Sequence, residues 1–227
     1  MAHRDKNKLK AAGMLRLLSL WLAIALQIAS AKSTAATPEI DRPMLSCDFG
    51  DVMIDVSFSS ARLNSCKQTE KGVFSVSTAP ENVPINPSPW YAFKVYSENL
   101  QDITLYLHYP LYTHRYLPKI STDGRTWQAI EQDDMELLFD GKAIKLRLSV
   151  GPDALWVAAQ EIIDNKLYDS YTSELAELDF LERKVLGSSV DGRPIYMLET
   201  TTPADRYIVL IGRQHPPEIT GALGMKH

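Results

Sequence analysis

Short runs in which apolar and polar residues alternate recur from about residue 38 to residue 155. Such alternation is typical of strands that bury one face and expose the other. Asp123-Gly124 and Asp140-Gly141 are turn signals between these runs. Short strands spaced about ten residues apart predict an antiparallel β-sandwich over residues 38–160. The expected strands lie at residues 52–58, 92–96, 103–107, 143–148 and 155–159.

After the predicted sandwich, the apolar spacing changes from two residues to three or four. From Leu175 to Val185, leucines and valine recur at intervals that would line one face of a helix. Thr172 or Ser173 could supply the N-cap of that helix. We therefore expect a connecting helix within residues 161–184. Its acidic residues lie mainly off the apolar stripe, which favours a solvated face over a catalytic carboxylate pair.

The last segment combines a strand signal with two side chains that can bind a metal ion. Residues 207–211 form a β-branched run typical of a buried strand. His215 and Glu218 follow, three positions apart, so both can face one ion. Pro216 favours extended geometry at His215, and with Pro217 it suits the first turn of a helix. The predicted order is strand, ligand turn and helix.

Two ligands do not complete a catalytic zinc site, which needs three protein ligands and an open position for water. If a helix follows Glu218, His227 lies roughly 13 Å further along its axis, too far to share the ion. His108 and His114 lie in an aromatic-rich stretch of the predicted sandwich, where packing roles are favoured. On spacing alone, an ordinary surface or turn role for His215 and Glu218 stays open.

The context of the pair resembles the zinc carboxypeptidase family. Residues 187–195 match the pattern GxSxxGRPI, which in that family forms a hairpin leading into a central strand and the loop with the first two zinc ligands. His215 and Glu218 correspond to those two ligands. The Pro216-Pro217 pair and the stretch RYLPKISTDGRTW at residues 115–127 resemble the branch related to cytosolic carboxypeptidases. Members of that branch carry a β-rich domain ahead of the catalytic one.

The resemblance implies a zinc-dependent hydrolase that removes C-terminal residues from peptides or proteins. It implies an α+β chain in which residues 185–227 begin an α/β catalytic domain. The family's third zinc histidine, its substrate-binding arginines and its catalytic glutamate have no counterpart here, so no catalytic residue is assigned. We therefore expect a C-terminally truncated chain that is inactive alone. Pro217 occupies the position of the family's common arginine, whereas Arg213 could support the ligand loop or form a structural salt bridge.

Two alternatives to the carboxypeptidase interpretation remain. A zinc enzyme of related fold removes acyl groups from amino-acid derivatives with a similar His-x-x-Glu pair, although the β-rich front domain argues against it. The other alternative is a secreted β-sandwich binding module whose C-terminal segment has no activity.

The N-terminus predicts export. Basic residues precede an apolar stretch at residues 17–28, and small residues at 29–31 form a cleavage site, so residues 1–31 are typical of a secretory signal peptide. The apolar stretch is short for a bilayer span, which favours cleavage over membrane anchoring. A periplasmic or extracellular location then favours a disulfide between Cys47 and Cys66 over two buried thiols.

Charge and composition narrow the classes of partner. The first 31 residues carry five basic side chains and one acid, so the formal charge of −4 becomes −8 without them. The remaining residues are therefore net acidic, and they contain no glycine-rich phosphate loop and no basic stripe. These features argue against a nucleic-acid partner. Residues 185–227 are too few to bury an independent core. We expect their strands to form one edge of a larger sheet.

Overall fold

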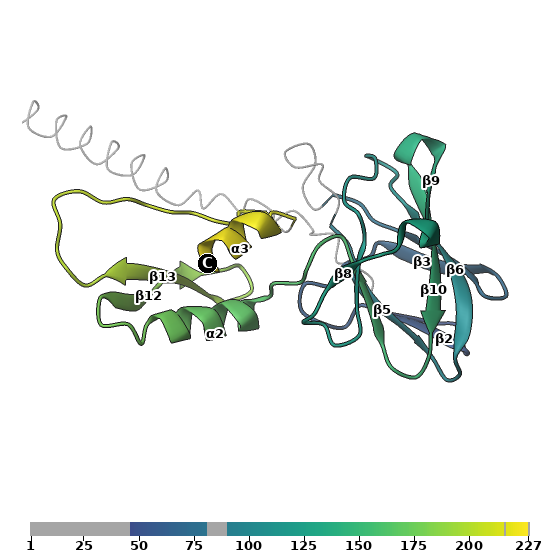
Figure 1. The fold of residues 1–227 in the computed structure, drawn as a ribbon, viewed down its shortest axis with the longest axis horizontal. Coiled ribbons are helices and arrows are strands. Elements are labelled where there is room, and N and C mark those ends of the chain that lie inside the picture. The colour runs from purple at the N-terminus through teal and green to yellow at the C-terminus, as the bar shows by residue number, and fades with distance from the viewer. Residues whose placement is uncertain (1–45, 81–89, 216, 227) are drawn as a thin grey trace, which may run out of the picture. The chain divides into compact units, whose positions relative to one another are not determined.

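The computed structural model describes residues 46–80, 90–215 and 217–226. Within these residues the fold is mostly β, with two α-helices (Figure 1). None of the helices in the described part of the chain is both long enough and apolar enough to cross a bilayer. The signal peptide expected at residues 1–31 lies outside the described residues.

Two sheets make up the N-terminal part, and all five strands expected from the alternation are present, as β2, β5, β6, β10 and β11. The first sheet has the order β1 (Ser46–Asp48), β2 (Val52–Asp55), β5 (Ala92–Ser97), β11 (Leu155–Ala158), β7 (Lys119–Ser121) and β8 (Gln128–Ala129). The second has the order β3 (Ser65–Glu70), β4 (Val73–Ser77), β6 (Gln101–His108), β10 (Ala143–Val150) and β9 (Met135–Leu138), with 3-10 turns at Gln132–Asp134 and Phe139–Gly141.

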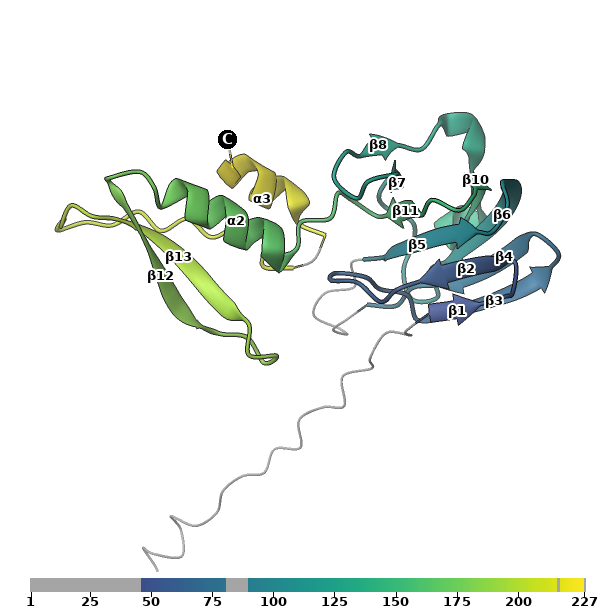
Figure 2. The same ribbon diagram turned by 90° about the horizontal axis from the view of Figure 1, so that it is seen from below.

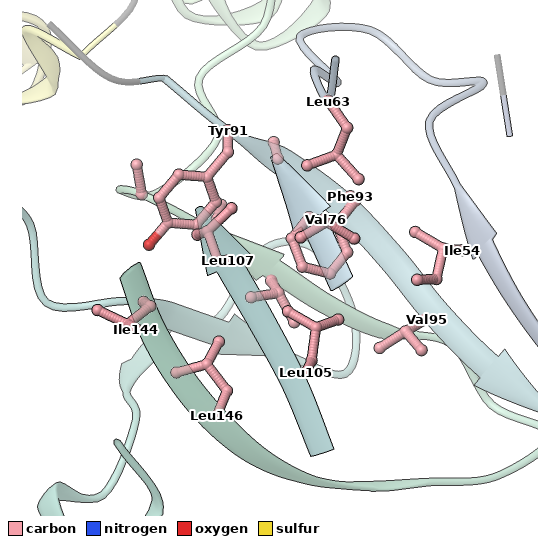
Figure 3. Packing of buried hydrophobic residues seen from close by; sticks show 14 of the residues in the cluster. Ile54, Leu63, Val76, Tyr91, Phe93, Val95, Leu105, Leu107, Ile144 and Leu146 are labelled. Atoms are coloured by element: carbon pink, nitrogen blue, oxygen red, sulfur yellow. The ribbon is translucent and has the colours of Figure 1, made fainter. Parts of the chain in front are cut away.

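Alternate side chains of the two sheets meet in one apolar core (Figure 3). Phe93 and Val95 of β5 in the first sheet and Leu105 and Leu107 of β6 in the second are each fully buried. Because every second residue of a strand points to the same face, the period of two in the sequence translates directly into this core. The N-terminal part is therefore a two-layer sandwich.

The prediction of a purely antiparallel sandwich is wrong at one pair of strands. β4 and β6 pair in parallel, from Val73 opposite Thr104 to Ser77 opposite His108. The intervening strand β5 belongs to the other sheet, so the chain crosses the sandwich and returns in its original direction. A parallel pair requires such a crossover, whereas a short hairpin would produce an antiparallel pair.

The connecting helix is shorter than the sequence pattern predicts. Helix α2 spans Asn165–Leu175, and its N-cap is Asp164, whose carboxylate accepts a hydrogen bond from the Leu167 amide at 2.9 Å. Neither Thr172 nor Ser173 caps it. Leu181 and Val185, expected on the helical stripe, lie instead in strand β12 (Leu181–Ser188), where pairing with another strand satisfies their backbone.

The partner of β12 is β13 (Pro194–Thr200), and the two form an antiparallel hairpin with a bulge between Val185 and Gly187. Helix α2 packs on this hairpin, as Figures 1 and 2 show. Arg183 of β12 joins the two elements, since its guanidinium bonds to Asp169 and Ser173 of α2 and stacks on the Tyr196 ring.

The structure joins Cys47 and Cys66 in a disulfide, with 6.4 Å between the Cα atoms. The bond links β1 of one sheet to β3 of the other. It closes a loop of nineteen positions.

Replacing both cysteines by serine is expected to lower the free energy of unfolding by about 3 kcal/mol, because a loop of this size loses that much closure entropy in the unfolded chain. Urea unfolding of the oxidised protein and of the Cys47→Ser/Cys66→Ser variant measures the difference. Equal midpoints would contradict the prediction.

Two histidines of the sandwich make its stability depend on pH. Burial lowers the pKa of His114, and burial together with Lys67 lowers the pKa of His108. In the unfolded chain both would titrate near their ordinary pKa of about 6.5. The unfolded state therefore binds more protons as the pH falls below that value, and the free energy of unfolding should fall with it.

We expect His114→Gln to weaken this pH dependence, measured as urea unfolding midpoints between pH 5 and 8. The same slope in the variant and the wild type would show that His114 does not contribute.

Candidate metal centre

His215 and Glu218 face each other across a single tight turn. The Glu218 amide donates to the His215 carbonyl at 3.1 Å, which closes the turn. The His215 amide donates to Glu218 Oε2 at 3.0 Å, and His215 Nδ1 lies 2.6 Å from Glu218 Oε1. Helix α3 (Ile219–Lys226) begins at the next residue. The structure thus brings together the two side chains that the sequence singles out, directly before the expected helix.

Hydrogen bonds within the turn favour the ionised form of its acid. The side chain and the backbone amide of His215 both donate to Glu218 and hold the pKa of that carboxyl below its usual range. The His215 and Glu218 side chains are 44% and 48% exposed. An ionised carboxylate and an imidazole nitrogen are therefore available together, and solvent reaches both.

The chemistry of this donor pair fits zinc, which binds imidazole nitrogen and carboxylate oxygen. Bonds of roughly 2.0–2.2 Å in tetrahedral geometry separate two donors by about 3.3 Å. The donors here are 2.6 Å apart because they hydrogen-bond to each other. For an ion to replace that hydrogen bond, the Nδ1 proton would pass to solvent or to Nε2, and the Glu218 carboxylate would move away by roughly 0.7 Å.

A third ligand does not come from the residues that the structure describes. Among them, no group of three or more His, Cys, Asp or Glu side chains could hold a metal ion. His108 belongs to β6 in the sandwich, and His114 Nδ1 lies 3.0 Å from the Tyr109 hydroxyl. His227 lies outside the described residues.

The segment before the turn differs from the expected buried strand. Residues 207–211 are assigned to no strand, and their side chains are between 68% and 90% exposed. A β-branched run forms a strand only when a neighbouring strand satisfies its backbone groups. None of the described strands pairs with this run, so it is irregular despite its composition.

The hairpin that the sequence pattern places upstream is present. The turn between β12 and β13 is closed by the Ser189 amide donating to the Arg193 carbonyl at 2.8 Å. Gly192 has a φ of 74°, in the left-handed region where glycine meets no steric penalty. The glycine of the GRPI pattern is thereby explained by the backbone of this turn.

A pocket of about 320 Å³ lies beside the ligand turn. His215 and Arg213 line it from the turn, Tyr168 lines it from α2, and Trp90 lines it from the sandwich. From the sequence, Trp90 belongs to a group of aromatic residues that could form a ligand surface, although packing in the core is favoured for them. Tyr168 belongs to no local motif, and only the fold brings it to His215.

Arg213 lies two residues before His215, and its guanidinium is half-buried. Its Nη1 donates to the carbonyl of Ile163, fifty positions earlier in the chain. The sequence leaves two roles open for Arg213, support of the ligand loop and a structural salt bridge. The contact with Ile163 is a hydrogen bond to the backbone.

No protein-family model and no curated protein matches the sequence. Solved structures do match. A metallo-carboxypeptidase from Burkholderia cenocepacia superposes with a TM-score of 0.62 and 18% identity, over 78% of this chain and 48% of that one. A metallo-carboxypeptidase from Pseudomonas aeruginosa, solved in complex with (2-guanidinoethylmercapto)succinic acid, gives 0.59 and 19%, over 76% of this chain and 47% of that one.

The chain therefore resembles bacterial metallo-carboxypeptidases in fold, at low sequence identity. It spans about half the length of the solved structures that it matches.

Proposed function

We propose that this chain forms part of a zinc-dependent metallocarboxypeptidase, a hydrolase that removes C-terminal residues from peptides or proteins. His215 and Glu218 are its proposed zinc ligands. The observation that carries the proposal is their geometry, with Nδ1 and the carboxylate facing each other across one turn directly before α3. The likeness of the fold to metallo-carboxypeptidases supports it.

The extent of the structural match favours a carboxypeptidase over the deacylase alternative. Residues from 161 onward make up less than a third of the chain, whereas the match covers 78% of it. The matched region must therefore include much of the sandwich. In the branch of carboxypeptidases that the sequence resembles, a β-rich domain precedes the catalytic one.

Each part of the turn has a defined task in this proposal. Zinc, when bound, lowers the pKa of a water molecule and polarises the scissile carbonyl. The imidazole of His215 and the carboxylate of Glu218 supply two donors, and the backbone hydrogen bonds of the turn orient them beforehand. The third ligand and the general base are not assigned to any residue of this chain.

We also propose that the protein is exported to the periplasm or the extracellular space. The signal-peptide pattern at residues 1–31 motivates this proposal. The disulfide between Cys47 and Cys66 supports it, because such bonds persist in oxidising compartments.

The zinc assignment predicts that the 227-residue chain binds one equivalent of zinc and that His215→Ala or Glu218→Ala weakens binding at least about tenfold. Each substitution removes one of only two protein donors. Isothermal titration with zinc chloride at pH 7.5 gives the affinity, and circular dichroism checks that the variants are folded.

His108→Gln is the matched control, because this histidine lies in the sandwich and should leave the zinc affinity unchanged. Undiminished zinc binding by His215→Ala would remove the assignment of the site and with it the proposed function.

A further inference from the structure

The ligand turn is exposed, yet the chain is fixed on both sides of it. After the turn, Ile219 and Ala222 of α3 are 1% and 4% exposed and belong to the apolar core cluster. The Tyr171 hydroxyl of α2 also donates to the Met225 carbonyl of α3. Burial of these two residues therefore fixes helix α3, which follows Glu218. The segment before His215 needs a different contact to fix it.

Close packing of the backbone restricts that entry. A Cβ atom at Gly212 would lie 2.6 Å from Met225 Sδ and 3.3 Å from the Gly221 carbonyl oxygen. A larger residue at position 212 would require the exposed Met225 side chain to move and the Gly221 carbonyl to shift by a few tenths of an ångström. The next residue, Arg213, has a φ of 49°, in the left-handed region that non-glycine residues seldom adopt. A residue keeps such a conformation when its surroundings hold it there.

The side chain of Arg213 makes the contacts that keep this residue in its left-handed conformation. Its Nη1 donates to the Ile163 carbonyl, and burial lowers the pKa of the guanidinium while Tyr168 and Asp164 counteract that effect. Ile163 is itself buried and directly precedes Asp164, the N-cap of α2. The acceptor therefore lies in the apolar core cluster, directly before the first turn of α2.

We propose that Arg213 is a positioning residue, which fixes the entry of the ligand turn to the start of α2 and so sets the location of His215. Its relevance to metal binding rests on the proposed function. The planar guanidinium bonds to the Ile163 carbonyl while it also interacts with Tyr168, and the single ammonium of a lysine reproduces this only in part.

The proposal is tested with Arg213→Ala, Arg213→Lys and Arg206→Ala in the 227-residue chain. Arg206 is an exposed arginine in the same connecting segment and serves as the matched control. Hydrogen exchange of the backbone amides of Arg213 (or its replacement), Gln214, His215 and Glu218 is measured without metal. Zinc affinity is measured by titration, and thermal unfolding reports on the rest of the protein.

In Arg213→Ala we expect the turn amides to exchange about tenfold faster, because a charge-assisted hydrogen bond to the backbone is lost. Zinc should bind about tenfold more weakly, the loss typical of a group that orients a ligand. Arg213→Lys should recover part of both effects, and Arg206→Ala should behave as the wild type. The thermal midpoint should fall by only several degrees in Arg213→Ala, so that all four proteins stay folded in both assays.

Unchanged amide exchange at positions 213–215 and at Glu218 in Arg213→Ala would overturn the proposal. If the wild type binds zinc, an equal zinc affinity in Arg213→Ala would overturn it too. If the wild type binds no zinc but exchange in Arg213→Ala accelerates, Arg213 positions the turn as inferred, and it is the proposed function that fails.

Discussion

Burial of alternate side chains between the two sheets is the constraint on which the candidate site depends. It fixes Tyr91 and Ala159, whose backbones are joined by a hydrogen bond of 3.0 Å at the point where the chain leaves β11. Ile163, four residues further on, is buried in the same cluster. Because the carbonyl of Ile163 accepts the bond from Arg213, the apolar core determines where the ligand turn can be attached. The site depends on the sandwich although its two donors lie far from it in sequence.

Local patterns predicted the elements whose stability is decided locally. Alternation located β5, β6 and β10 because their inward side chains are buried whatever strand lies beside them. It missed β3, which has the sequence SCKQTE and lies at the edge of its sheet with little burial. A strand without an apolar face leaves no period in the sequence, and only its pairing with β4 makes it a strand.

The errors arise where a distant partner decides the outcome. The apolar spacing from Leu175 to Val185 suits a helix, but pairing with β13 makes its second half a strand. The β-branched run at residues 207–211 has strand propensity and no described partner, so it stays irregular. Propensity differences amount to about 1 kcal/mol at most per residue, and pairing or its absence outweighs them. Likewise, β4 and β6 pair in parallel because the strand between them, β5, belongs to the other sheet. No local sequence pattern specifies which sheet a strand joins.

The same division applies to the candidate site. The three-residue spacing of His215 and Glu218 is local and sufficed to predict that they meet, whereas the contact of Arg213 with Ile163 spans fifty positions and could not be predicted. The hydrogen bond between the two donors does not oppose metal binding strongly. An exposed bond of this kind is worth about 0.5–1.5 kcal/mol, whereas a full set of zinc ligands contributes roughly 10–16 kcal/mol. Even half of that contribution exceeds the cost of separating the donors, so their contact preorganises the pair at little energetic cost.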